Sequence, residues 1–122
     1  MILLDSNILI YAAKPGYDAV REFIANDQPI VSIISKVEVL GYHLLTSEQK
    51  QRLEQLFAVL PILPVTNEVA DWAIALRQKR KMSLGDSLIA GTALSFGLTL
   101  VTANIRDYAW IEGIELLNPL AL

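Results

Sequence analysis

Acidic and amide side chains stand at four separated places in this sequence, each close to a strongly apolar run. In chain order they are Asp5, Glu38, Asp86, Asn104 and Asp107. An ionised carboxylate that adjoins a core is costly unless hydrogen bonds or a cation compensate it. Several carboxylates in one place repel one another and raise one another's pKa, a conflict that a divalent cation removes. Grouped together, these residues would serve phosphoryl or phosphodiester chemistry at a metal held by carboxylates.

The metal that suits this donor set is Mg²⁺ or Mn²⁺, because both prefer carboxylate and water oxygens. The sequence contains no cysteine and a single histidine, His43. Zinc coordination and a thiol nucleophile therefore have no support. We expect His43 to lie mid-helix among apolar residues in a structural role, which leaves a metal-bound water as the source of general-base chemistry.

Short apolar runs alternate along the chain with stretches of helical pattern. The pattern predicts strands at 1–5, 29–33, 61–65, 98–102 and 113–119. It predicts helices from about 7, at 17–26, 35–45, 47–60, 67–81 and 84–96, the last ended by Gly97. Such alternation with near-continuously apolar strands is typical of a parallel sheet covered by helices on both faces. We predict one domain over 1–122, an α/β/α sandwich with a four- to five-stranded parallel sheet.

This architecture would bring the acidic positions to one edge of the sheet. Sites in open parallel sheets form outside the carboxyl ends of the strands. Asp5 ends the first strand, and Glu38 lies in the first turn of the helix that leaves the second. The helix that carries Asp86 leads back into the strand at 98–102, so Asp86 starts at the carboxyl edge, and the segment 104–107 follows that strand directly.

Each of these residues also has an ordinary structural interpretation. The segments 35–38 and 83–86 fit the capping box, in which an acid in the third position bonds back to the cap amide. Asn67 and Asp107 could cap helices, and Asp5 could begin an Asx-turn. Capping needs no neighbours of like charge, however, so it does not explain why the acids gather with Asp5.

Composition and charge limit the remaining classes. The net charge is −3, so the total gives no general attraction to nucleic acid, but four cations gather at 77–81. That cluster is also typical of the solvated C-terminal end of a helix.

The opening strand with an acid at position 5 is not the pattern of a signal peptide, and the uncharged stretch 87–105 contains glycine, threonine and serine residues that suit a buried helix and strand. We therefore expect a soluble, cytoplasmic protein that spans no membrane. The 53% of hydrophobic residues would suit a self-interface or a groove for a partner as well as a core.

Four segments resemble, in order, the four motifs of PIN-domain nucleases: LLDSNILIYA, SIISKVEVLGY, LGDSLIAGTAL and LVTANIRDY. The resemblance covers nearly the whole chain and is greatest to the short prokaryotic VapC-type toxins of type II toxin–antitoxin systems. It implies a PIN-like three-layer sandwich and an endoribonuclease that depends on Mg²⁺ or Mn²⁺. It also implies an RNA substrate, a small cognate antitoxin protein that restrains the toxin, and a homodimer.

Carried over position by position, the resemblance makes Asp5, Glu38 and Asp86 metal-binding acids. Asn104 stands where many members have Asp, so Asn104 or Asp107 would complete the site, and a second metal would be held weakly. The supporting residues would be Thr102, through its hydroxyl, and Ser6, which with Asn7 turns the chain away from Asp5. Candidate contacts to the RNA backbone are Lys36, Arg77, Lys79, Arg80, Lys81 and Arg106.

Two further questions follow from the same residues. Because of Asn104, the chain could instead be a catalytically weak binding module on the PIN fold. The apolar helices on either side of LLTSEQ (44–49) could form a dimer face or a groove for an amphipathic antitoxin segment.

Overall fold

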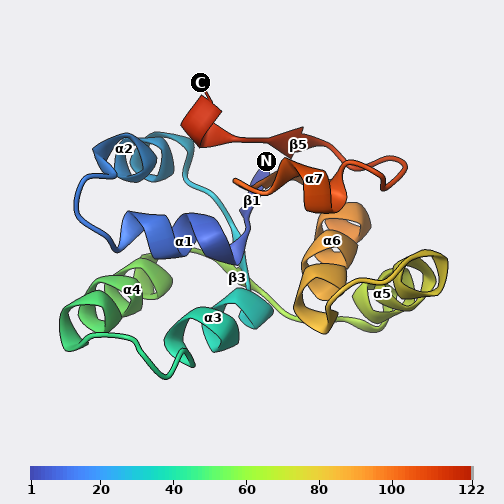
Figure 1. Ribbon diagram of the computed structural model, residues 1–122, viewed down its shortest axis with the longest axis horizontal. Helices are drawn as coiled ribbons and strands as arrows, with labels where there is room; N and C mark the ends of the chain where they lie inside the picture. The colour runs from blue at the N-terminus through green and yellow to red at the C-terminus, as the bar shows by residue number, and fades with distance from the viewer. Residues whose placement is uncertain (122) are drawn as a thin grey trace.

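The computed structural model describes residues 1–121 (Figure 1). The strands are β1 (Ile2–Leu4), β2 (Val31–Ser32), β3 (Ile62–Leu63), β4 (Thr99–Val101) and β5 (Leu116–Leu117). The helices are α1 (Ser6–Ala12), α2 (Asp18–Asp27), α3 (Ile33–Leu40), α4 (Ser47–Val59), α5 (Asn67–Lys79), α6 (Leu84–Phe96), α7 (Ile105–Tyr108) and the 3₁₀ turn η1 (Pro119–Ala121). Within these residues, no helix combines the length and the apolar character needed to cross a membrane.

All strand pairs are parallel, as the sequence predicts. β1 and β5 flank β4, and β2 pairs with β3. Backbone hydrogen bonds from Leu4 N to Ile30 O (3.0 Å) and from Ile30 N to Ile2 O (2.9 Å) join the two groups. The strands therefore follow one another in the order β3-β2-β1-β4-β5, and the chain leaves β1 toward β2 on one side and adds β4 on the other.

Two hydrophobic cores cover the two faces of this sheet. Successive side chains of a strand point to opposite faces, so Leu4 and Val101 pack with α1–α4, whereas Leu3 and Leu100 pack with α5–α7. All four leucine and valine side chains are completely buried. Figure 1 shows the same division, with α1–α4 on one side of the molecule and α5–α7 on the other. The three-layer α/β/α prediction is confirmed.

The helix after β2 begins earlier than predicted. Ser32 caps α3, because its Oγ accepts a hydrogen bond from Ile34 N (3.0 Å). The interpretation of 35–38 as a capping box is therefore wrong, and Ser35 is buried inside the helix. Glu38 lies in the second turn of α3 rather than the first.

The same helix also ends earlier than predicted. α3 stops at Leu40 with Gly41 as its C-terminal cap, and residues 41–45 form turns instead of continuing the helix. His43 is therefore exposed in a turn, and the expectation that it lies mid-helix is wrong. Glycine weakens a helix interior, which explains why the apolar pattern did not extend it.

The two helices over the second face match the prediction more closely. Thr66, not Asn67, caps α5, because its Oγ1 accepts from Val69 N (3.1 Å). α6 has the predicted bounds and ends at Gly97, whose φ of 65° lies in the left-handed region that favours glycine.

Candidate functional site

Asp5 lies directly after β1, at the point where the strand order changes direction between β1 and β4. Ligands of open α/β sheets bind at such a switch point. The Asp5 carboxylate is only 6% exposed. Its Oδ1 accepts from Ser6 N (2.8 Å), and its Oδ2 accepts from the Thr102 hydroxyl (2.8 Å) at the end of β4. The supporting positions predicted for Ser6 and Thr102 thus both contact Asp5.

A buried tyrosine joins Asp5 to Asp86. The hydroxyl of Tyr108, on α7, lies 3.2 Å from Asp5 Oδ2 and 3.1 Å from Asp86 Oδ1. The side chain is 1% exposed, so its ring packs in the core while its oxygen reaches the site. A phenol carries one proton, and it therefore serves two carboxylates that compete for it.

Burial determines the electrostatics of this group. It raises the pKa of Asp5 above the ordinary value, and the nearby charge of Asp86 raises it further, against the hydrogen bonds from Thr102, Ser6 and Tyr108. Burial, followed by the charges of the two carboxylates, also raises the pKa of Tyr108. The phenol therefore remains a hydrogen-bond donor throughout the physiological range.

Glu38 reaches the same region from α3. Its Oε1 accepts from the Ser6 hydroxyl (2.8 Å), which also lies 3.0 Å from Ser35 Oγ. Its Oε2 lies against Gly85, where an added Cβ would come within 2.3 Å. Glycine at position 85 thus lets the Glu38 carboxylate rest on the first turn of α6, one residue from Asp86.

Asp86 takes part in the helix cap through its backbone but not through its side chain. The Ser83 hydroxyl accepts from Asp86 N (3.1 Å), as in a capping box. The Asp86 carboxylate does not complete the box with the cap amide and accepts from Tyr108 instead. The cap therefore fixes the backbone of α6 while the carboxylate serves the site.

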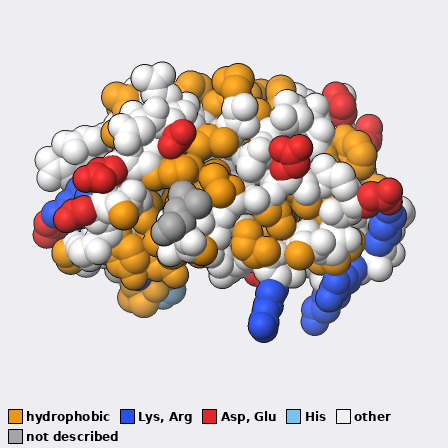
Figure 2. Space-filling model, turned by 90° about the horizontal axis from the view of Figure 1, so that it is seen from above, with side chains coloured by type: hydrophobic (Ala, Val, Ile, Leu, Met, Phe, Trp, Pro, Cys, Tyr) orange, Lys and Arg blue, Asp and Glu red, His pale blue; other side chains and the backbone are white. Residues whose placement is uncertain are grey.

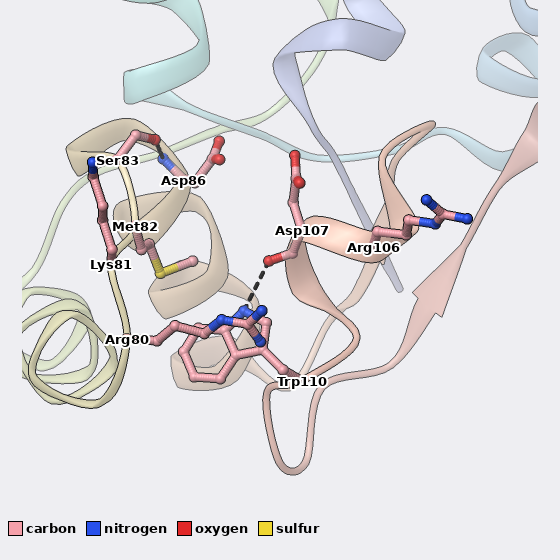
Figure 3. A pocket seen from close by; sticks show the side chains of 8 residues that line it. All are labelled: Arg80, Lys81, Met82, Ser83, Asp86, Arg106, Asp107 and Trp110. Atoms are coloured by element: carbon pink, nitrogen blue, oxygen red, sulfur yellow. Dashed lines mark hydrogen bonds between the residues drawn. The ribbon is translucent and has the colours of Figure 1, made fainter.

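The last two predicted positions make no side-chain hydrogen bond to these carboxylates. Asn104 is exposed at the start of α7, where its backbone N donates to Thr102 Oγ1 (3.0 Å) and its side chain makes no capping bond. Asp107 is exposed and lines, together with Asp86, a cavity of about 480 Å³. Figure 3 shows both carboxylates at the mouth of this cavity. Asp107 is thus closer to the predicted arrangement than Asn104.

The carboxylates of Asp5, Glu38 and Asp86 lie in one region but do not enclose a cation. Within residues 1–121, no three side chains of the Asp, Glu, His and Cys types are grouped closely enough to enclose a metal. No lysine or arginine among these residues forms an ion pair with Asp5, Glu38 or Asp86, since the two ion pairs found there are Arg21–Asp18 and Arg52–Glu48. Asp5 and Asp86 share the hydroxyl proton of Tyr108, and neither forms an ion pair with a lysine or arginine among the described residues. Such a pair fits Mg²⁺ or Mn²⁺, because Mg²⁺ usually binds through one or two carboxylates and keeps several waters.

The model of the PIN domain matches residues 2–109 of this sequence. The chain belongs to the PIN domain family. Ribonuclease VapC10 of Mycobacterium tuberculosis is 32% identical, over 94% of this chain and 91% of that protein. Ribonuclease VapC1 of Rickettsia felis is 29% identical, over 96% and 95%. A solved toxin–antitoxin complex from Klebsiella pneumoniae contains a chain that is 30% identical and superposes with a TM-score of 0.76, over 98% of both chains.

The predicted basic residues of this PIN domain divide into three groups. Arg80, Lys81 and Arg106 line the cavity beside Asp86. Arg77 faces the neighbouring groove between α5 and α6, where its Nε donates to Met82 O (3.3 Å). The residues that are exposed and line no cavity described here are Lys36 and Lys79. Figure 2 shows lysine and arginine side chains projecting from the half of the molecule that contains α5 and α6.

Sequence reasoning missed two residues of the site in this PIN domain. Tyr108 bridges the carboxylates, and Trp110 lines the cavity. Asn7, predicted only to turn the chain, also lies 3.5 Å from both Thr102 Oγ1 and Ala103 N, which ties α1 to the end of β4. The available signal was the pair Asp107-Tyr108 in the fourth motif. A hydroxyl on an otherwise buried aromatic ring needs a polar partner, and the carboxylates at this edge supply it.

Proposed function

We propose that this chain is a metal-dependent endoribonuclease and the toxin of a VapBC-type toxin–antitoxin pair. The observation that carries the proposal is the buried Asp5–Tyr108–Asp86 arrangement at the switch point of the sheet. It has hydroxyl donors but no protein cation among the described residues. The names of the VapC relatives and the toxin–antitoxin complex add support from outside the site.

In this proposal, the chain would bind Mg²⁺ or Mn²⁺ through Asp5, Glu38 and Asp86, and Asn104 or Asp107 would complete the shell. When bound, the cation would supply charge stabilisation on the phosphate oxygens and activation of water. Thr102 and Tyr108 orient the carboxylates of Asp5 and Asp86.

A second candidate is a binding module of the same fold with weak catalysis. Two observations favour it: Asn104 is exposed and its side chain makes no capping bond, and no three-acid metal group is formed within residues 1–121. Calorimetric titration with Mn²⁺ separates the two candidates. Binding that Asp86→Asn removes supports the nuclease, whereas no binding at millimolar Mn²⁺ supports the module.

The main test compares RNA cleavage by purified wild-type protein and Asp86→Asn. We expect Mn²⁺-dependent cleavage that EDTA stops and that the variant loses by a factor of about 100 or more, since the removed charge belongs to the cluster that stabilises the transition state. Asp71→Asn is the matched control, because Asp71 is exposed on α5 and far from β1. Equal cleavage by wild-type protein and Asp86→Asn would contradict the proposal.

The antitoxin has a suitable groove on the other half of the molecule. A cavity of about 450 Å³ lies between α1, α3, α4 and the turn that contains LLTSEQ. Tyr42 and Leu44 line it while 51% and 65% exposed, which is unusual for large apolar side chains without a partner. We propose that an amphipathic antitoxin segment covers it and that the toxin forms a homodimer through a separate face. Leu44→Asp should weaken capture of the protein encoded beside this gene, whereas Leu120→Asp, also exposed, should not.

A further inference from the structure

The cavity beside Asp86 is built from three segments that are distant in the sequence. Its volume is about 480 Å³, within the range of small-molecule sites. The C-terminal end of α5, the first turn of α6, and α7 with the residues after it all contribute. Figure 3 shows the carboxylates of Asp86 and Asp107 on the same side of the lining residues, above Arg80 and Trp110. Whatever occupies this cavity therefore lies next to the proposed reaction centre.

One wall of the cavity contains an arginine side chain that lies over an aromatic ring. The guanidinium carbon of Arg80 lies 5.4 Å from the ring centroid of Trp110. The indole is held in place because its Nε1 donates to Asp107 O (3.0 Å). Arg80 is the residue at which α5 ends, and its extended backbone carries the side chain across to Trp110. The guanidinium and the indole together form an aromatic–cation platform, which Figure 3 shows below the carboxylates.

The cations that line the cavity form no ion pair among the described residues. Arg80, Lys81 and Arg106 line it together with Asp86 and Asp107. Among the residues that the structure describes, none of these three cations has a carboxylate oxygen within 4.0 Å. The positive charges therefore remain available to an anion, although the carboxylates lie at the same opening.

We propose that this cavity binds one unpaired nucleotide of the RNA strand, next to the phosphate that is cleaved; the inference rests on the proposed function. The base stacks on the Arg80–Trp110 platform, since guanidinium planes and indole rings both stack nucleobases. The adjoining phosphate faces Lys81. Only an unpaired nucleotide can do this, because a base within a duplex has both faces covered. An acidic peptide would form ion pairs with the cations but would place no base on the Arg80–Trp110 platform.

The test measures the binding of a fluorescently labelled single-stranded RNA hexamer in EDTA, so that no cleavage occurs. Lys81 and Lys50 provide a matched pair: both are exposed lysines, and only Lys81 lines the cavity, since Lys50 lies on α4. We expect Lys81→Gln to weaken binding roughly five-fold and Lys50→Gln to leave it unchanged. Arg80→Lys keeps the charge but removes the plane, and we expect it to weaken binding roughly ten-fold, as loss of one stacked base does.

A second measurement locates the base. The chain has two tryptophans, and Trp72 is 40% exposed on α5, so Trp72→Phe makes Trp110 the single indole fluorophore. In that variant we expect the unlabelled hexamer to quench the Trp110 emission saturably, at the concentration that gives half-maximal binding in the first assay.

The outcomes separate this inference from the proposed function. Unquenched Trp110, or an equal loss of binding in Lys50→Gln and Lys81→Gln, overturns the nucleotide site even where the wild-type protein cleaves RNA with Mn²⁺. Quenching together with a selective effect of Lys81→Gln supports the site, and it does so even where no cleavage is found. Absent cleavage alone counts against the nuclease.

Discussion

The substitution Tyr108→Phe removes one oxygen atom and tests whether the Tyr108 hydroxyl holds the carboxylates of Asp5 and Asp86 in position. The phenylalanine ring keeps the core packing of a side chain that is 1% exposed. Among residues 1–121, the change deletes the one group within hydrogen-bonding distance of both Asp5 Oδ2 and Asp86 Oδ1. If the hydroxyl holds these carboxylates in position, then both the stability of the metal-free protein and its affinity for Mn²⁺ should fall.

The structure gives an approximate size for each effect. A hydrogen bond to a charged group contributes about 1.5–3 kcal/mol, and we take the lower figure because one proton is shared between two acceptors. With an unfolding entropy of about 2.1 cal/mol/K per residue, a loss of about 1.5 kcal/mol in a chain of 122 residues lowers Tm by about 6 °C. Residues that orient metal ligands typically change metal affinity 10- to 100-fold, so we expect Mn²⁺ to bind at least about 10-fold more weakly.

Thermal unfolding in EDTA, followed by circular dichroism, measures the first effect, and Mn²⁺ calorimetry measures the second. Tyr17→Phe is the matched control, because Tyr17 is partly buried beside a core and its hydroxyl has no hydrogen-bond partner among the described residues. A lower Tm with unchanged Mn²⁺ affinity would make Tyr108 purely structural. An unchanged Tm together with unchanged affinity would refute the reasoning from the shared proton.

Two further predictions concern the same cluster. Because burial raises the pKa of Asp5 in the folded state, the native protein binds more protons than the unfolded chain above the ordinary pKa, so this group lowers stability as pH rises through that window. Asp5→Asn should therefore have a higher free energy of unfolding than the wild-type protein at pH 7 in EDTA, by about 1 kcal/mol in urea unfolding. This gain should shrink toward pH 4. A variant that is less stable than the wild-type protein at pH 7 would contradict the prediction. Gly85→Ala places a Cβ within 2.3 Å of Glu38 Oε2, so Glu38 must move. We expect Tm to rise or stay constant, since alanine favours a helix by about 0.5–1 kcal/mol over glycine, while RNA cleavage falls; full activity would show that the position of Glu38 is unimportant.

The sequence predicted the parts of the fold that depend on strong local patterns. The positions of the strands followed from the apolar runs, and the rule that the carboxyl ends of parallel strands share one edge brought Asp5 and Asp86 together although 80 residues separate them. Gly97 ended α6 as predicted, because few other residues adopt a φ of 65° without strain.

The errors arose where two local signals competed. Both Ser32 and Ser35 can cap the helix that carries Glu38, and the sequence alone gave no reason to prefer Ser32. Tertiary contact decides between them: Ser35 is completely buried beside Ser6, so its hydroxyl is used across two helices rather than along its own. Tyr108 was missed for a similar reason, since its role depends on three segments meeting in space.

The cluster is held by hydroxyl and amide donors rather than by cations, and this choice has a functional consequence. A lysine or arginine beside Asp5 would remove the electrostatic conflict permanently and leave no reason for a metal to bind. Thr102, Tyr108 and the Ser6 amide orient the carboxylate without cancelling its charge, so the net negative charge remains for an external cation. Arg80, Lys81 and Arg106 line the adjoining cavity instead, where a polyanionic strand would need them. Under the proposed function, a metal and a phosphate backbone would therefore be attracted by different side chains beside Asp86, in a chain whose total charge is −3.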